Sequence, residues 1–188
     1  MLSLIKEIKK CTICADYLPL GPRPTFQVST KSKICIIGQA PGRKVHETGI
    51  AWDDPSGKRL RDWLDVSENQ FYDSDQFALI PMGFCYPGKG ISGDLPPRHE
   101  CAPTWHELIL NSMTSIKLIL LIGSYSQSYY LKDSKTLTDR VRNFKDYDDT
   151  YFPLPHPSPR NNIWIKKNTW FVNEVLPNLK TRVSKILK

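Results

Sequence analysis

The sequence lacks any long apolar run. Its longest apolar stretches, such as Leu118–Ile122, fall far short of the roughly 20 residues that a membrane-spanning helix needs. Met1–Lys10 contains no apolar segment of signal-peptide length before Lys6. These absences predict a protein that does not associate with membranes and that resides in the cytoplasm.

Internal repeats and low-complexity segments are also missing. Hydrophobic residues make up 40% of the 188 positions, which argues against global disorder. A chain of this length can bury one substantial core. We therefore expect a single domain over residues 1–188, acting as a monomer.

Cysteine is sparse, and its number is odd. The five cysteines are Cys11, Cys14, Cys35, Cys85 and Cys101. An odd number without a secretion signal argues against a disulfide framework. Ligation of a metal or an inorganic cluster is the better interpretation for the paired cysteines, whereas Cys35 lies inside an apolar run and is expected to be a buried free thiol.

Acidic residues are outnumbered by basic ones. Lysine and arginine total 26, aspartate and glutamate total 19, and the formal charge is +7. A positive charge favours encounter with polyanions such as nucleic acids, although many soluble proteins are mildly basic. The sequence contains no G-x-S-x-G nucleophile elbow, which disfavours an α/β hydrolase.

Short apolar runs without alternation predict strands that are covered on both faces. Helical patterns lie between these runs, and strands that alternate with helices indicate a mainly parallel sheet. The fold class is therefore α/β, with three α/β/α layers around a central four-stranded sheet. Ligands of such folds bind beyond the carboxyl ends of the strands. The predicted strands are Ile34–Ile37, Ala78–Pro81, Leu118–Ile122 and Tyr151–Leu154.

The helical patterns differ in strength. Ala102–Met113 is expected to present Trp105, Leu108 and Ile109 on one apolar face, and Pro177 is expected to break or kink the C-terminal helix. The glycine- and proline-rich segment 86–97 is predicted to be irregular. The other predicted helices are Gly57–Leu64, Tyr125–Leu131 and the tail from Asn162.

The first strand runs into Gly38–Gly42, which reads GQAPG. Glycine in such a turn permits positive φ and close approach of a ligand, but an ordinary strand-to-helix turn explains it equally well. The loop continues to Gly57, and loops of this length are often functional. It contains an aromatic ring, carboxylates and a histidine, which are suited to stacking a base and activating a water.

The last strand runs into His156–Asn162, which begins HPSP. Pro157 and Pro159 disfavour helix around Ser158, so His156 is expected to project from a rigid extended segment. A rigid loop before a helix is suited to phosphate contact. The alternative is a surface turn with an incidental histidine.

A strand that ends in GQAPG, paired with a later strand that ends in HPSP, resembles the uracil-DNA glycosylase superfamily. Between them, Pro96-Pro97-Arg98 with Glu100 and Cys101, followed by LILLIG, is similar to the thermophile-type family that carries an iron–sulfur cluster. The resemblance extends from Cys11 to Val175. It implies a DNA glycosylase that hydrolyses the N-glycosidic bond of uracil or a related deaminated or damaged base.

The cysteines provide an independent comparison. Cys11 and Cys14 form a C-x-x-C pair, Cys85 follows the second strand, and Cys101 opens the next helix. This layout is similar to the cluster ligands of the thermophile-type family. Four thiolates suit a [4Fe–4S] cluster or a structural Zn²⁺ equally well on chemistry alone.

The resemblance also assigns site residues. His156 would donate a hydrogen bond to the departing base, and Trp52 would face it across a cleft and stack on the flipped base. Asp53, His46 and Glu47 are the candidates for the water-activating acceptor, and Gln39 stands where the thermophile-type family has an acid. Ser158 would contact a phosphate and Arg160 would insert into the minor groove. The base-binding turn is Gly38, Ala40, Pro41 and Gly42, and the basic rim is Arg43, Lys44, Arg160, Lys166 and Lys167.

Two departures from the family pattern leave an alternative open. Ala40 replaces the aspartate that usually follows the Gly-Gln of the first motif, and Pro81 replaces an asparagine that reads the uracil edge. A catalytically weak or inactive module that binds DNA lesions is therefore the second hypothesis.

Overall fold

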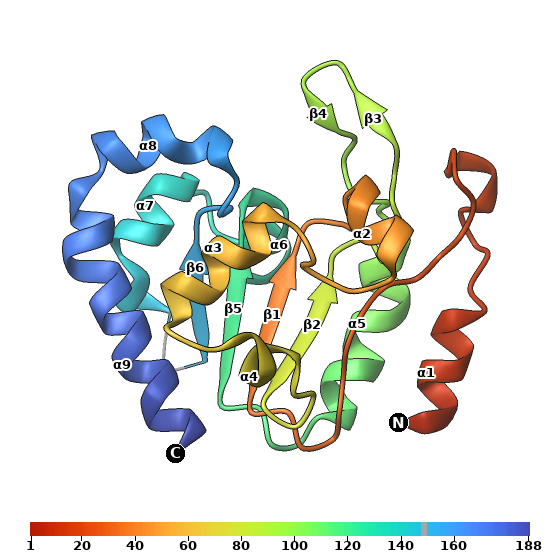
Figure 1. The fold of residues 1–188 in the computed structure, drawn as a ribbon, viewed down its shortest axis with the longest axis horizontal. Coiled ribbons are helices and arrows are strands. Elements are labelled where there is room, and N and C mark those ends of the chain that lie inside the picture. The colour runs from red at the N-terminus through yellow and green to blue at the C-terminus, as the bar shows by residue number, and fades with distance from the viewer. Residues whose placement is uncertain (148–149) are drawn as a thin grey trace.

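Four buried strands form the centre of the molecule (Figure 1). The chain is described here by a computed structural model that places residues 1–147 and 150–188. The strands run parallel in the order β2-β1-β5-β6. The chain passes from β1 outward to β2, returns to the other side of β1 for β5, and continues outward to β6. Their bounds are β1 (Ile34–Gly38), β2 (Phe77–Pro81), β5 (Leu118–Ile122) and β6 (Tyr151–Leu154), each within one residue of the prediction.

Helices cover both faces of this sheet. Successive side chains of a strand point to opposite faces; Ile34 and Ile36 of β1 join one apolar core, and Cys35 and Ile37 join the other. The first core packs under α3 (Pro55–Leu64) and α9 (Leu176–Leu187), and the second packs under α1 (Leu2–Lys9) and α5 (Cys101–Ser112). The predicted three-layer α/β/α architecture is confirmed.

Shorter elements complete the structure. The short helices are α2 (Arg43–Thr48), α4 (Glu68–Tyr72), α6 (Ser124–Leu131), α7 (Leu137–Arg142) and α8 (Asn162–Lys167). Single 3-10 turns are η1 (Ala15–Tyr17), η2 (Phe144–Asp146) and η3 (Pro159–Asn161), and a π-helical turn, η4 (Phe171–Val175), leads into α9.

Pro177 was expected to break or kink the C-terminal helix, and the helix does not break there. Pro177 lies in the first turn of α9, and the helix runs through it from the π-helical turn η4. The break falls earlier, at Asn168, after α8 ends. A proline lacks an N–H and its ring clashes with the carbonyl four residues back. The wider π-helical turn just before Pro177 accommodates both effects.

Two other predictions needed correction. Leu108 is 51% exposed rather than inward-facing, and His106 takes the buried position on α5, because these residues lie roughly 200° apart around the helix. The segment 86–97 is not wholly irregular. It contains a hairpin of β3 (Lys89–Gly90) and β4 (Gly93–Asp94), whose strands are too short to produce a detectable pattern.

His106 is a polar group enclosed by the core. Its Nδ1 lies 2.6 Å from the Tyr130 hydroxyl and its Nε2 lies 3.1 Å from the carbonyl oxygen of Pro81. A carbonyl only accepts, so Nε2 carries the proton and Nδ1 accepts from Tyr130. Burial lowers the pKa of His106 to about 4. The ring therefore stays neutral and ties α5 to the end of β2.

This lowered pKa predicts a pH-dependent stability. His106 has its ordinary pKa of 6.5 in the unfolded chain and about 4 when folded, so the unfolded chain binds its proton first as the pH falls. The contribution is complete above about pH 6.5 and is lost toward pH 4, a difference of roughly 3 kcal/mol at most. Chemical denaturation of the wild type and His106→Gln across this range measures it. A stability gap between the two proteins that does not shrink below pH 6.5 contradicts the prediction.

Candidate active site

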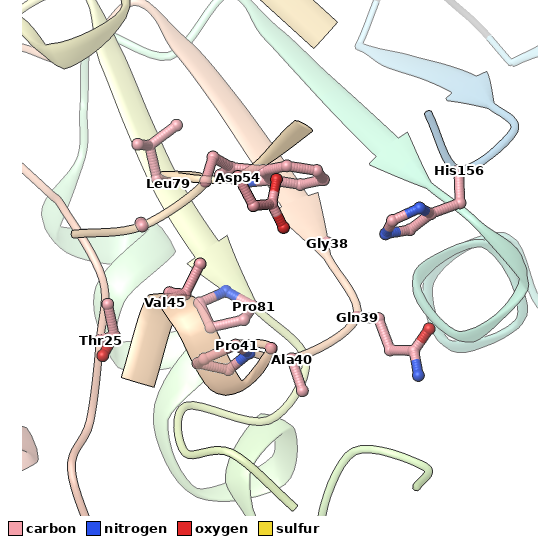
Figure 2. A pocket seen from close by; sticks show the side chains of 13 residues that line it. Thr25, Gly38, Gln39, Ala40, Pro41, Val45, Asp54, Leu79, Pro81 and His156 are labelled. Atoms are coloured by element: carbon pink, nitrogen blue, oxygen red, sulfur yellow. The ribbon is translucent and has the colours of Figure 1, made fainter. Parts of the chain in front are cut away.

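A pocket opens at the carboxyl edge of the sheet, between the loops that follow β1 and β6 (Figure 2). The pocket is small, with a cavity volume of about 50 Å³. The lining residues are Thr25, Gly38, Gln39, Ala40, Pro41, Gly42, Val45, Ala51, Trp52, Asp54, Leu79, Pro81 and His156.

Trp52 forms one wall because two glycines make room for it. A Cβ on Gly38, at the end of β1, would lie 2.7 Å from Cζ2 of the indole, and one on Gly57 would lie 1.8 Å from the Trp52 carbonyl oxygen. Trp52 itself has a φ of 60°, which is unusual for a residue other than glycine. Neither Gly38 nor Gly42 has a positive φ, which glycine in this turn would permit. Gly38 is needed for the close approach of Trp52 instead.

His156 lies next to the end of β5 and stacks on Trp52. A Cβ on Gly123 would lie 3.8 Å from the His156 Cβ, and the His156 and Trp52 rings stack with centroids 5.7 Å apart at 28°. The expectation that these two residues face each other across an open cleft is therefore wrong. Rings at this separation are in direct contact, so a base cannot enter between them. The base would have to bind beside the stacked pair, in the space that Figure 2 shows between His156, Pro41 and Pro81.

The HPSP loop determines which nitrogen of His156 carries the proton. The backbone N–H of Ser158 donates to Nδ1 of His156 at 3.2 Å, and the Asn161 amide donates to the His156 carbonyl at 2.7 Å. Burial lowers the pKa of the imidazole, while the nearby Asp54 carboxylate raises it. Above pH 6.5 the ring is therefore neutral, with its proton on Nε2 and available for donation to a bound group.

Asp54 supplies a carboxylate to the same pocket. It is the N-cap of α3, where Oδ1 accepts from the Gly57 N–H at 2.7 Å. Asp54 lines the pocket and also its outer mouth, and it is the charge that acts on His156. A carboxylate beside a neutral donor can orient a water while the donor stabilises a developing anion.

The two loops that carry GQAPG and HPSP thus meet at one pocket beyond the strand ends. A family model described as the uracil DNA glycosylase superfamily matches residues 26–180 of the chain. The chain belongs to the uracil DNA glycosylase superfamily. Members of this superfamily are generally hydrolases that act on N-glycosyl bonds.

Most predicted base-site residues of this glycosylase-family protein line the pocket. They are Gly38, Gln39, Ala40, Pro41, Gly42, Trp52 and His156. The three candidates for the water-activating acceptor do not. Asp53 pairs with Lys44 at 3.3 Å, Glu47 pairs with Arg43 at 2.9 Å, and His46 is buried beside Tyr86. Asp54, rather than the predicted Asp53, lines the pocket, and an aspartate followed by a proline is an N-cap signal that could have pointed to Asp54.

The outer mouth of the uracil DNA glycosylase pocket is polar. Ser158 and Arg160 line it as predicted, together with Asp94 and Asn161. Ser158 also caps η3, accepting from the Arg160 N–H at 3.3 Å. Of the predicted basic rim, Arg43, Lys44, Lys166 and Lys167 are not among the lining residues of the pocket or its mouth.

The wall at Pro81 offers little to a polar ligand. Its side chain has no hydrogen-bonding group, and its carbonyl accepts from His106. Ala40, which also lines the pocket, contributes only a methyl group. The two substitutions noted in the sequence thus leave part of the glycosylase pocket apolar.

Four of the five cysteines gather on one side of the glycosylase domain. Cys14 and Cys85 share a buried cluster with Leu18, and Cys101 lies near enough to Cys14 to affect the pKa of that thiol. Burial, together with the sulfurs of Cys14, Cys85 and Cys11, raises the pKa of Cys101 to about 12. Cys35 is a buried thiol within β1, as predicted, in the same apolar core that includes Cys101. Within residues 1–147 and 150–188, no group of three or more candidate ligands is arranged to hold a metal ion.

The described residues include no helix with the length and apolar character required to cross a bilayer.

The pairing of Asp54 with His156 predicts a change that is measurable without substrate. Because the Asp54 carboxylate raises the pKa of His156, Asp54→Asn should lower that pKa further. Asparagine is also a good N-cap, so α3 should persist. NMR titration of the imidazole nitrogens provides the measurement. The matched control is Asp53→Asn, which removes the neighbouring carboxylate and should leave the pKa of His156 in place; equal effects from both variants would contradict the assignment.

Proposed function

We propose that this protein removes uracil or a related deaminated base from DNA by hydrolysis of the N-glycosidic bond. The observation that carries the proposal is the placement of a neutral imidazole donor and a carboxylate in one small pocket, at the strand ends of a glycosylase-family fold. The target base would leave the duplex and enter this pocket beside the Trp52–His156 pair.

His156 is the proposed leaving-group donor. As the bond between C1′ of the sugar and the base nitrogen breaks, its electron pair moves onto the base, and negative charge develops on a base carbonyl oxygen. A hydrogen bond from Nε2 would stabilise that charge. The Ser158 N–H keeps the other ring nitrogen occupied, so the donor is held in one tautomer. The departing anion then takes a proton from solvent.

Asp54 is the proposed water-activating residue. Its carboxylate would accept a proton from a water whose oxygen forms the new bond to C1′. The Gln39 amide borders both the pocket and its mouth, and it would help to position this water. The role that the sequence suggested for Asp53 passes to Asp54, because Asp53 lies outside the pocket and pairs with Lys44.

Substitution of these two residues should separate chemistry from DNA binding. Losing a positioned donor to a developing anion costs about two to three orders of magnitude in rate, roughly 2.7–4 kcal/mol. We expect His156→Ala to lose excision to that extent and Asp54→Asn to lose about two orders of magnitude or more, with nearly unchanged duplex affinity. Single-turnover excision, read by alkaline strand cleavage, and fluorescence anisotropy provide the two measurements.

The substrates should be duplexes that carry uracil, hypoxanthine, xanthine or a 5-substituted uracil. Asp53→Asn is again the matched control and should retain excision. Wild-type binding to these duplexes without release of any base would favour the lesion-binding module, the function that the apolar Pro81 and Ala40 walls would suit. Full activity of His156→Ala would remove this residue from the mechanism.

We further propose that Cys11, Cys14, Cys85 and Cys101 bind a [4Fe–4S] cluster, with a structural Zn²⁺ as the alternative, as in the thermophile-type family. The proposal is supported by four cysteines from three separate segments that lie near enough to affect one another's pKa. The thiols would have to close slightly around the metal, since they are neighbours rather than a formed ligand set. The group would be structural, tying the N-terminal segment to β2 and α5.

Cysteine variants test this ligand set. Cys14→Ser and Cys101→Ser should lose bound metal and lower the unfolding temperature, because a structural metal contributes its binding free energy to folding. Cys35→Ser, which alters the one cysteine outside the group, should retain metal. Elemental analysis and the visible spectrum of purified protein distinguish iron from zinc. Metal-free wild-type protein with unchanged stability would exclude the site.

A further inference from the structure

A fully buried polar side chain lies behind the His156 loop and has no part in the chemistry proposed above. Gln127 belongs to α6, which begins just after β5 ends (Figure 1), and its relative exposure is 0%. Glutamine is seldom buried completely in proteins, because its amide has four hydrogen bonds to satisfy. The contacts of this amide must therefore explain why it is enclosed in the protein at this place.

The Gln127 amide joins the ends of two neighbouring strands. Its Nε2 donates to the Leu154 carbonyl at the end of β6, at 2.9 Å, and to the Leu121 carbonyl in β5, at 3.3 Å. Both partners can only accept, so the amide nitrogen has to face them. The two strands are parallel, and their carboxyl ends belong to the edge of the sheet that carries the pocket. A single side chain thus ties β5 to β6 where their own pairing stops.

This tie lies immediately before His156 in the chain. The Leu154 carbonyl also accepts from the Gly123 N–H at 2.9 Å, and a Cβ on Gly123 would lie 3.8 Å from the His156 Cβ. Only Pro155 separates Leu154 from His156, and the ring of a proline fixes its φ. A displacement of the Leu154 carbonyl would therefore be passed on to the imidazole, because the connecting segment has little freedom to absorb it.

The Gln127 amide is only partly satisfied by its surroundings. Its Oε1 is buried and has no hydrogen-bond partner among the described residues. A buried acceptor without a partner costs free energy, and an apolar side chain of similar size would avoid that cost. The strands β5 and β6 are already joined by their own backbone ladder. Gln127 therefore suits the placement of the strand ends better than it suits the stability of the core.

We propose that Gln127 is a positioning residue, which holds the ends of β5 and β6 so that His156 presents its Nε2 to a bound base. The proposal rests on the proposed function, since it takes His156 as the donor to the leaving base. Gln127 is not among the residues that line the pocket or its mouth. Its effect on the reaction is therefore indirect and passes through the main chain at Leu154.

Gln127→Met tests this role, because methionine fills a similar volume and has no hydrogen-bond donor. The maximal rate of single-turnover excision from a uracil duplex should fall between about tenfold and a hundredfold, since a misplacement of roughly 1 Å can cost that much. The protein concentration that gives half of the maximal rate should stay near the wild-type value. The unfolding temperature should stay within about 3 °C of wild type, because the two lost hydrogen bonds are offset by removal of the unpartnered oxygen.

Gln27 provides a matched control at the opposite edge of the sheet. Its Nε2 also donates to two main-chain carbonyls, those of Phe77 at 2.8 Å and Phe71 at 3.4 Å, but at the amino end of β2. Gln27→Met should lower the unfolding temperature and leave the excision rate unchanged, which is the opposite of the result expected for Gln127→Met. Equal losses of rate in both variants, or a Gln127→Met protein that fails to fold, would make the role of Gln127 purely structural and overturn the proposal.

NMR of the free protein separates this proposal from the proposed function. The Ser158 N–H donates to Nδ1 of His156, so the two imidazole nitrogens of wild type should have the well-separated chemical shifts of one tautomer. In Gln127→Met the shifts should move closer together as the loop loosens, and in Gln27→Met they should not. That change, with no excision by wild type, would retain the positioning role and reject the glycosylase activity. Unchanged shifts in Gln127→Met would reject the positioning role, whether or not wild type excises a base.

Discussion

The packing of the Trp52 indole on the backbone of Gly38 is the contact on which the pocket depends. It requires positions 38 and 57 to lack a side chain, and it holds Trp52 at a φ that a residue other than glycine rarely adopts. With Trp52 fixed, the chain can turn at once into α3, so Asp54 becomes its N-cap and faces the pocket. The same indole gives His156 a ring to stack on. One contact thus places groups that are more than 100 residues apart in the sequence.

The electrostatics of the pocket follow from this placement. Burial lowers the pKa of His156 and so favours the neutral imidazole, whereas the Asp54 carboxylate raises that pKa. The carboxylate accepts from the Gly57 N–H, and the ring accepts from the Ser158 N–H. If His156 were charged, the two groups would attract each other and the carboxylate would be less available to a water. A neutral donor instead leaves Asp54 as an acceptor. Acid–base roles are often divided in this way when two titratable groups occupy different environments in one site.

The sequence predicted the sheet well because each strand is a continuous apolar run ended by a turn residue, and both faces are buried. It predicted the pocket from the two strand-end motifs, since parallel strands bring their carboxyl ends to one edge. It could not choose between Asp53 and Asp54, because adjacent side chains of a loop diverge according to where the next helix begins. The hairpin was missed because two-residue strands have no periodicity, and the packing of Trp52 against Gly38 depends on contacts that no local pattern records.

Selection among bases has to arise from few polar atoms in such a pocket. Pro81 and Ala40 present apolar surface, and the Pro81 carbonyl is already bonded to His106. Apolar contacts discriminate weakly between molecules of similar shape, whereas buried hydrogen-bonding groups discriminate strongly. The remaining polar side chains, such as Gln39 and His156, therefore carry whatever recognition of base edges occurs. A second source of selectivity precedes the pocket, because a mispaired base leaves the stack at lower cost than a paired one. Discrimination would then be shared between extrusion and capture.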